Sequence, residues 1–196
     1  MRQRLFILLA FGILPGCGNS APTTAPDLTG SWQSCANLAP KSSRVTMAFS
    51  GVNVTLTTEY FYANSTCTGT ANQAATIVAT YATGTVLADG QGALSLILLT
   101  SQRVYGTAGD ASTANTNVSC GISTWSTGVA LAIDNKTCAS DNGATITTVP
   151  GSGLLMEYSL ENGALKTDYP VYWDGLFRQS SPIGKRLTGI YTFIRI

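Results

Sequence analysis

The sequence predicts an all-β protein that closes into an antiparallel barrel of about eight to ten strands. Three observations support this prediction. Short runs alternate apolar and polar residues, turn-forming pairs rich in glycine, asparagine and aspartate separate the runs, and only 11% of the 196 residues are charged. A β-sandwich is the alternative, but we favour a barrel because closure leaves no strand edges exposed.

The clearest hairpin covers residues 44–62. Met47 and Phe49 share one face, a turn is predicted at residues 50–51, and the alternation resumes at Val52. Further runs with the same period of two are predicted as strands, and they cover residues 75–81, 94–100, 122–133, 144–149, 154–160, 164–167 and 187–196.

No part of the chain after its first 16 residues combines helical spacing with capping residues. Residues 103–117 mix Val104 and Tyr105 with glycine and aspartate, which predicts a strand that runs into a loop. We therefore expect no helix in the folded part of the chain.

Residues 1–16 predict a signal peptide. Arg2 and Arg4 give the segment a basic start, and residues 5–14 form an apolar run that only Gly12 interrupts. This run is too short for a transmembrane helix, which needs about 20 residues. The chain is therefore predicted to be exported.

The leader ends in Leu14-Pro15-Gly16-Cys17, which resembles the lipobox of bacterial lipoproteins. The resemblance implies cleavage after Gly16, attachment of a diacylglycerol to Cys17, and acylation of the new amino group by a chain such as palmitate. Gly18 in place of aspartate implies the outer membrane, by similarity to enterobacterial sorting rules. An ordinary cleaved leader with an incidental Cys17 is the alternative.

The rest of the chain divides into a tether and one domain. Residues 17–27 hold the lipidated cysteine and a small, polar, proline-containing stretch that cannot bury enough apolar surface to fold. Residues 28–196 are long enough for a single domain with its own core.

An exported chain is expected to oxidise its cysteines. Cys35, Cys67, Cys120 and Cys138 allow three pairings, and we favour Cys35–Cys67 with Cys120–Cys138 because each pair flanks a continuous β segment. A zinc site is the competing interpretation, but no pair has C-x-x-C spacing and the chain has no histidine. We predict no metal site and no cofactor.

Composition argues against nucleic-acid binding and against catalysis. The formal net charge is +1, without the clustered basic residues that a phosphate backbone requires. The absence of histidine excludes Ser-His-Asp and Cys-His arrangements. Asp168 and Asp174 are the candidate carboxylate pair, but they lie in a proline-containing segment and are predicted to be turn residues. We predict that the protein is not an enzyme.

Gly30-x-Trp32 at the start of the first strand resembles the signature of the lipocalin barrels. The resemblance implies a lipocalin-like β-barrel in which Trp32 closes one end and a basic residue near the last strand packs across its ring. Lys185, Arg186 and Arg195 are the available partners, and Arg195 is on the final predicted strand.

A wider pattern covers residues 28–67. Trp32, Cys35, an alternating hairpin and the aromatic-rich residues 59–62 before Cys67 are similar to the extracellular modules of the adenomatosis polyposis coli down-regulated family. The pattern also resembles small bacterial lipoproteins of unassigned role.

Two groups of residues are candidates for ligand binding. Tyr172 and Trp173 lie in an aromatic stretch, residues 169–177, which is typical either of a loop at a barrel mouth or of core packing. The other group has side chains predicted to face the barrel interior, and its members are Met47, Phe49, Leu56, Met156 and Tyr158.

These observations support two hypotheses about function. The first is an outer-membrane lipoprotein, facing the periplasm or the cell surface, that binds or carries a small hydrophobic ligand. The second is a structural lipoprotein whose filled core leaves only its loops to contact another envelope protein.

Overall fold

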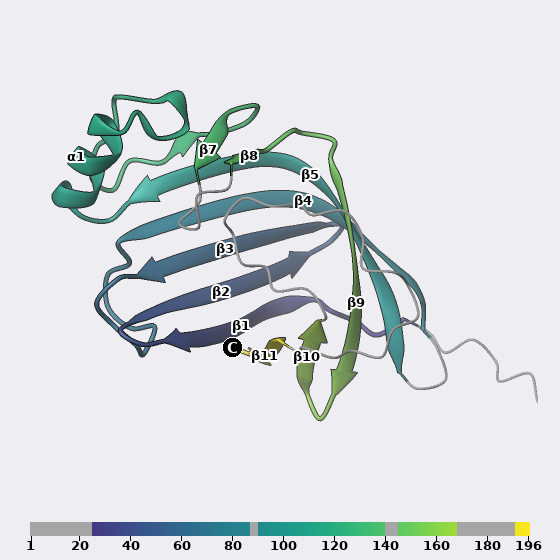
Figure 1. Cartoon of the computed structure of the whole chain (residues 1–196). Helices are drawn as coiled ribbons and strands as arrows, with labels where there is room; N and C mark the ends of the chain where they lie inside the picture. The colour runs from purple at the N-terminus through teal and green to yellow at the C-terminus, as the bar shows by residue number, and fades with distance from the viewer. Residues whose placement is uncertain (1–24, 87–89, 140–144, 168–190) are drawn as a thin grey trace, which may run out of the picture.

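The computed structural model describes residues 25–86, 90–139, 145–167 and 191–196 (Figure 1). The described part is mostly β, as the sequence predicts, and no helix in it is long and apolar enough to cross a membrane. Its elements are β1 (Gly30–Leu38), β2 (Lys41–Ser50), β3 (Asn53–Phe61), β4 (Gln73–Val86), β5 (Gln91–Tyr105), α1 (Ala108–Thr116), η1 (Ser119–Gly121), β6 (Leu131–Ala132), β7 (Thr137–Ala139), β8 (Thr145–Thr147), β9 (Gly153–Glu161), β10 (Ala164–Thr167) and β11 (Tyr191–Arg195).

Eight of the described strands form a closed antiparallel barrel. The order around the barrel is β1-β2-β3-β4-β5-β9-β10-β11, and β11 pairs with β1 to complete the ring. Barrel strands that follow one another along the chain pair in space, so the barrel is an up-and-down meander. The predicted closed barrel is therefore confirmed. Residues 106–152, which we call the insertion, separate β5 from β9.

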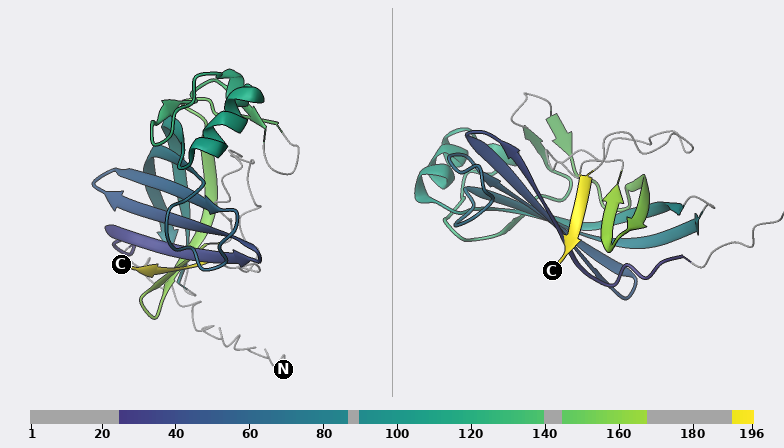
Figure 2. Two further views of the ribbon diagram at one scale, coloured as in Figure 1. Left: turned by 90° about the vertical axis from the view of Figure 1, so that its left-hand side faces the viewer. Right: turned by 90° about the horizontal axis from the view of Figure 1, so that it is seen from below.

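Connections in an up-and-down barrel alternate between its two ends. The connections after β1, β3 and β5 lie at one end, which we call the insertion end. The opposite end carries the turns after β2 and β9 together with the start of β1, and we call it the Trp32 end. The insertion end lies beside α1 in Figure 1, and the left view of Figure 2 looks onto it.

The predicted faces of the hairpin are confirmed. Met47, Phe49 and Leu56 point into the barrel and are at most 2% exposed. Val52 is an exception, because the turn lies at Gly51 and Val52 rather than at residues 50–51 and leaves Val52 68% exposed. The positive φ of Gly51, 59°, suits this tight turn.

The prediction that the folded part has no helix was wrong. Helix α1 begins after Thr107, whose Oγ1 accepts a hydrogen bond from the backbone N–H of Asp110 at 3.1 Å. Only Ala111 and Ala114 of this helix are buried. Small alanines leave no apolar stripe, so hydrophobic spacing gives no helical signal here.

The strand predicted at residues 122–133 was also largely wrong. Only β6 within this range is a strand, and it pairs with the part of β5 that extends past β9. Trp125 and Ile133 are buried but lie outside any assigned strand, so their apolar side chains reflect burial of a loop. The strand predicted at residues 144–149 is shorter than expected, since β8 covers three residues.

Both predicted disulfides are present. Cys35–Cys67 joins β1 to the connection after β3, with an S–S distance of 2.03 Å. Cys120–Cys138 joins η1 to β7, with an S–S distance of 2.10 Å. The first disulfide therefore braces the barrel, whereas the second lies entirely within the insertion.

Candidate binding site

The interior residues predicted to bind a ligand belong to the packed core. All are at most 2% exposed and pack within one hydrophobic cluster; they are Met47, Phe49, Leu56, Met156 and Tyr158. Phe49 also makes an edge-to-face contact with Tyr81, with ring centres 4.9 Å apart. Tyr172 and Trp173 lie outside the described residues.

The Trp32 end is closed by side chains of the protein itself. Trp32 is 1% exposed, and its Nε1 donates a hydrogen bond to Leu28 O at 2.8 Å. The guanidinium carbon of Arg195 lies 5.5 Å from the ring centre of Trp32, and Arg195 Nη2 donates to Thr29 O at 2.6 Å. A Cβ at Gly30 would lie 3.2 Å from the Arg195 guanidinium. The predicted packing of a basic residue on Trp32 is thus confirmed.

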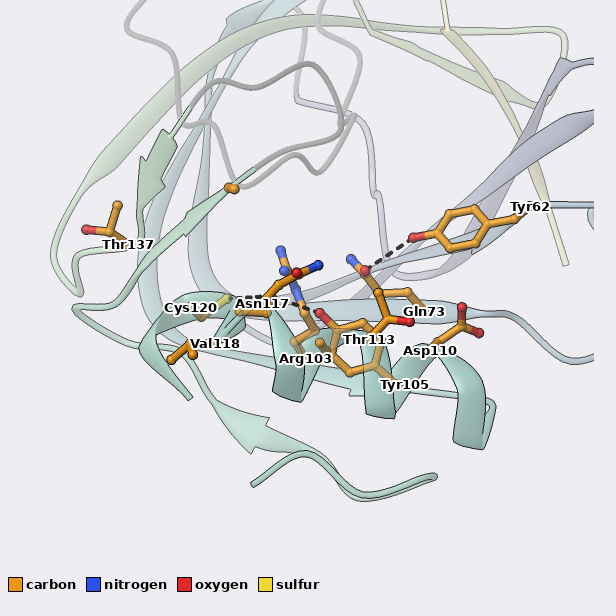
Figure 3. Close-up of a pocket in the computed structure, with 13 residues that line it drawn as sticks. Tyr62, Gln73, Arg103, Tyr105, Asp110, Thr113, Asn117, Val118, Cys120 and Thr137 are labelled. Carbon is orange, nitrogen blue, oxygen red and sulfur yellow. Dashed lines mark hydrogen bonds between the residues drawn. The ribbon is translucent and has the colours of Figure 1, made fainter. Parts of the chain in front are cut away.

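A pocket of about 460 Å³ lies at the insertion end (Figure 3). Tyr62, just after β3, and Gln73, the first residue of β4, line it, and Arg103 and Tyr105 line it from β5. Residues of α1, η1 and β7 complete its wall. This volume is within the range of small-molecule sites. The predicted ligand residues that the structure describes do not line the pocket; they are Met47, Phe49, Leu56, Met156 and Tyr158.

Arg103 is the group in this pocket whose bonding is least satisfied. It is 4% exposed, and its Nε has no hydrogen-bond partner among the described residues. Its guanidinium also makes no ion pair within the described part of the chain. In Figure 3, Tyr62 and Gln73 lie on one side of Arg103, and Cys120 and Thr137 lie on the other. A buried cation without such partners is rare in folded proteins.

Arg103 faces the pocket because β5 changes phase. Ala79 of β4 pairs with Leu98, but the adjacent Val78 pairs with Thr100. Leu99 is therefore an extra residue in a β-bulge. Buried residues of β5 have even numbers before the bulge and odd numbers after it. Strict alternation from Leu98 would instead turn Arg103 outward, so sequence analysis missed this residue.

Hydroxyl and amide groups surround the guanidinium side of the pocket. Tyr105 Oη and Ser119 Oγ lie 3.0 Å apart and share one hydrogen bond. The Tyr105 ring meets Trp125 edge to face, with ring centres 5.0 Å apart, and Trp125 Nε1 donates to Ser119 O at 3.2 Å. Tyr62 Oη donates to Gln73 Oε1 at 3.4 Å. These contacts hold several polar groups at the pocket surface.

Among the described lining residues, Asp110 is the other charged one. Its Oδ2 accepts hydrogen bonds from Asn72 Nδ2 at 3.0 Å and from Thr107 Oγ1 at 2.5 Å. The contact with Thr107 belongs to the start of α1, and the spacing Thr-x-x-Asp is the sequence signal that sequence analysis overlooked. The lining residues that the structure describes therefore have a formal charge of zero, from Arg103 and Asp110.

The turn after α1 holds two residues in the left-handed region. Val118 has φ 48° and Cys120 has φ 57°, and both line the pocket. A β-branched residue in this region is an outlier, and the conformation costs about 1–2 kcal/mol per residue. The bond from Cys120 to Cys138 helps to hold the turn in place. Strain of this kind is concentrated at functional sites.

No protein-family model matches the chain, and no curated protein sequence matches it. The candidate site therefore depends on geometry and chemistry alone.

The described residues that line the pocket offer groups that can recognise a ligand. No group of three or more His, Cys, Asp or Glu residues able to hold a metal ion occurs among them. What the pocket offers is a buried cation, hydroxyl and amide groups, and an apolar wall. Such an arrangement can bind a small molecule that has both a polar and an apolar part.

Proposed function

We propose that this chain is an exported bacterial lipoprotein that binds or carries a small hydrophobic ligand in the pocket at the insertion end. The pocket of about 460 Å³ is the observation that supports binding. The lipobox-like leader supports anchoring in the outer membrane through acyl chains on Cys17. The absence of histidine supports a binding role rather than an enzymatic one.

The wall of the pocket supports an apolar contact with the ligand. Ala114 of α1, Val118 and Cys120 face the same space as the Tyr105 ring. At the opposite end, Trp32 is 1% exposed and Arg195 packs over its ring. The ligand is therefore proposed to enter at the insertion end and to remain near the mouth of the barrel.

Labelling with radioactive palmitate tests the anchoring. The unmodified chain is expected to incorporate the label and to fractionate with the outer membrane, because acyl chains insert into the bilayer. A Cys17→Ser variant should incorporate no label. Equal labelling of both chains, or labelling of neither, contradicts the proposed anchor.

Native mass spectrometry tests the binding. The full chain carrying Cys17→Ser, exported and purified without detergent, is expected to retain a bound molecule of discrete mass. Thr113→Trp should reduce that retention, because Thr113 is exposed on α1 and lines the pocket. Ser112→Trp is the matched control, since Ser112 is exposed on the same helix but lies outside the pocket lining. Equal loss in both variants, or no bound mass in the parent, counts against the proposal.

A second candidate is an interaction lipoprotein that binds another envelope protein through its loops. The complete burial of the five predicted interior residues favours this alternative, because their side chains already fill that part of the barrel. The same spectra separate the two candidates. An empty protein that cross-links to a defined envelope partner supports interaction rather than carriage.

A further inference from the structure

We propose that Arg103 binds the carboxylate of a monoanionic ligand in the pocket at the insertion end. This inference rests on the proposed binding function and adds the chemical class of the ligand. Its starting point is a buried guanidinium that faces a cavity without a partner in the described part of the chain.

The environment of Arg103 calls for an anion. A guanidinium removed from water loses its hydration, and folded proteins normally restore that loss with a carboxylate or with hydrogen bonds. Arg103 is 4% exposed and receives no ion pair from the described residues. Its planar set of donors fits the two oxygens of a carboxylate side by side. A bound carboxylate therefore supplies the counterion and the hydrogen-bond acceptors that the described residues do not give Arg103.

Neighbouring hydroxyls can add to this recognition. Tyr105 lies two residues after Arg103 on the same face of β5, and both residues line the pocket. Tyr105 and Ser119 share one hydrogen bond, so only one of their two hydroxyl hydrogens is used between them. The other hydrogen can point to an oxygen of the ligand.

The charge of the lining favours a monoanion over a phosphate. Arg103 supplies one positive charge, and Asp110 contributes a negative charge to the same pocket. A phosphate monoester carries nearly two negative charges at pH 7, so one of them would remain without a counterion near Asp110. A carboxylate carries one charge, which Arg103 neutralises.

The remaining lining limits the rest of the ligand. Ala114, Val118 and the disulfide sulfur of Cys120 provide an apolar wall, and the volume of about 460 Å³ is near the lower end for ligand sites. The geometry therefore suits a short or compact apolar group attached to the carboxylate.

Binding of octanoate to the full chain carrying Cys17→Ser tests the proposal. Octan-1-ol and octanamide provide the same alkyl chain without charge, and inorganic phosphate provides the anion without the chain. Calorimetric titration measures affinity, and tryptophan fluorescence reports occupancy, because Trp125 contacts the pocket residue Tyr105. We expect octanoate to bind about 10- to 100-fold more tightly than the alcohol or the amide, and phosphate to bind more weakly than octanoate.

Variants of Arg103 separate recognition from structure. Arg103→Met should weaken octanoate binding about 10- to 100-fold, leave octan-1-ol binding unchanged, and not lower the midpoint of thermal unfolding of the empty protein. Arg103→Lys should retain part of the preference for octanoate, because the charge remains but the planar donor pair is lost. Arg195→Met, which removes the exposed arginine at the Trp32 end, should leave octanoate affinity unchanged.

Several results would overturn the inference. One is equal binding of octanoate, octanamide and octan-1-ol, which leaves the proposed binding function intact but removes the carboxylate. Another is a lower unfolding midpoint for Arg103→Met, which makes Arg103 a structural residue. Tighter binding of phosphate than of octanoate replaces the carboxylate with another anion. Failure of every probe, together with an empty native mass spectrum, rejects both the inference and the proposed function.

Discussion

Two arginines near opposite ends of the barrel have opposite environments. Arg195, at the Trp32 end, is exposed, packs over an aromatic ring and donates a hydrogen bond to Thr29 O. Arg103, at the insertion end, is buried, faces a pocket and has no ion pair within the described residues. At the Trp32 end, the arginine therefore uses its guanidinium in contacts within the protein. At the insertion end, the arginine has a guanidinium nitrogen without a hydrogen-bond partner among the described residues.

The comparison separates an end whose contacts support packing from the end at which we propose recognition. At the Trp32 end, every prominent polar contact supports the packing of a large apolar side chain. At the insertion end, a buried charge and two strained backbone positions surround a hollow. Proteins keep such unfavourable features where function requires them.

Trp32→Ala is expected to have the largest effect on stability. Trp32 is 1% exposed, so its removal leaves a large cavity and should lower the free energy of unfolding by about 3–5 kcal/mol. Urea unfolding followed by circular dichroism measures this change. Ligand affinity of the folded fraction should stay the same, and a loss below about 1 kcal/mol would show that this end is not the stable one.

Arg195→Ala tests the packing of Arg195 over the Trp32 ring. Loss of the ring contact and of the hydrogen bond to Thr29 should lower the free energy of unfolding by about 1 kcal/mol. Arg103→Met should instead raise the free energy of unfolding by about 1 kcal/mol, because it removes a buried charge without a described partner. If both variants changed the free energy of unfolding in the same direction, the two arginines would not differ in their effect on stability.

Val118→Gly tests the strain beside the pocket. Glycine adopts a φ of 48° without penalty, so the free energy of unfolding should rise by up to about 1 kcal/mol. Val129→Gly is the control, because Val129 is similarly exposed but does not have a positive φ. The control should be neutral or destabilising, and an equal gain in both variants would remove strain as the cause.

The smallest expected effect concerns Glu161, on the hairpin of β9 and β10. Hydrogen bonds from Lys166, at 2.5 Å, and from Ser159 hold the pKa of Glu161 below its ordinary value of 4.5. Its contribution to stability is therefore present above that value and is lost as the pH falls through the lowered pKa. Unfolding midpoints measured from pH 6 down to pH 2 should fall slightly less for Glu161→Gln than for the unchanged chain. Identical profiles would show that this exposed pair contributes nothing.

Much of the barrel could be predicted from the sequence because its strands are half-buried. Met47, Phe49 and Leu56 alternate with polar residues, so the period of two also identifies the interior face. Cys35–Cys67 followed from the export signal and the local spacing of cysteines. A family resemblance implied a basic partner for Trp32 near the last strand, and the alternation of residues 187–196 placed Arg195 on that strand.

The candidate site could not be predicted, because it depends on departures from regular periods. A single extra residue at Leu99 reverses the face on which Arg103 lies, and nothing in the apolar run around it marks the bulge. Helix α1 lacks an apolar stripe, so its contribution of Asp110 to the pocket had no signal beyond a capping pattern. Prediction was therefore best where packing repeats and poorest where recognition is proposed.

The Cys120–Cys138 link has an evolutionary consequence. Both sulfurs belong to the segment between β5 and β9, so the ring of eight strands closes without them. Substitutions in that segment can consequently alter the pocket residues that it contributes, while the barrel strands keep their pairing. The wall of the pocket that α1, η1 and β7 contribute can therefore vary independently of the β5 residues Arg103 and Tyr105.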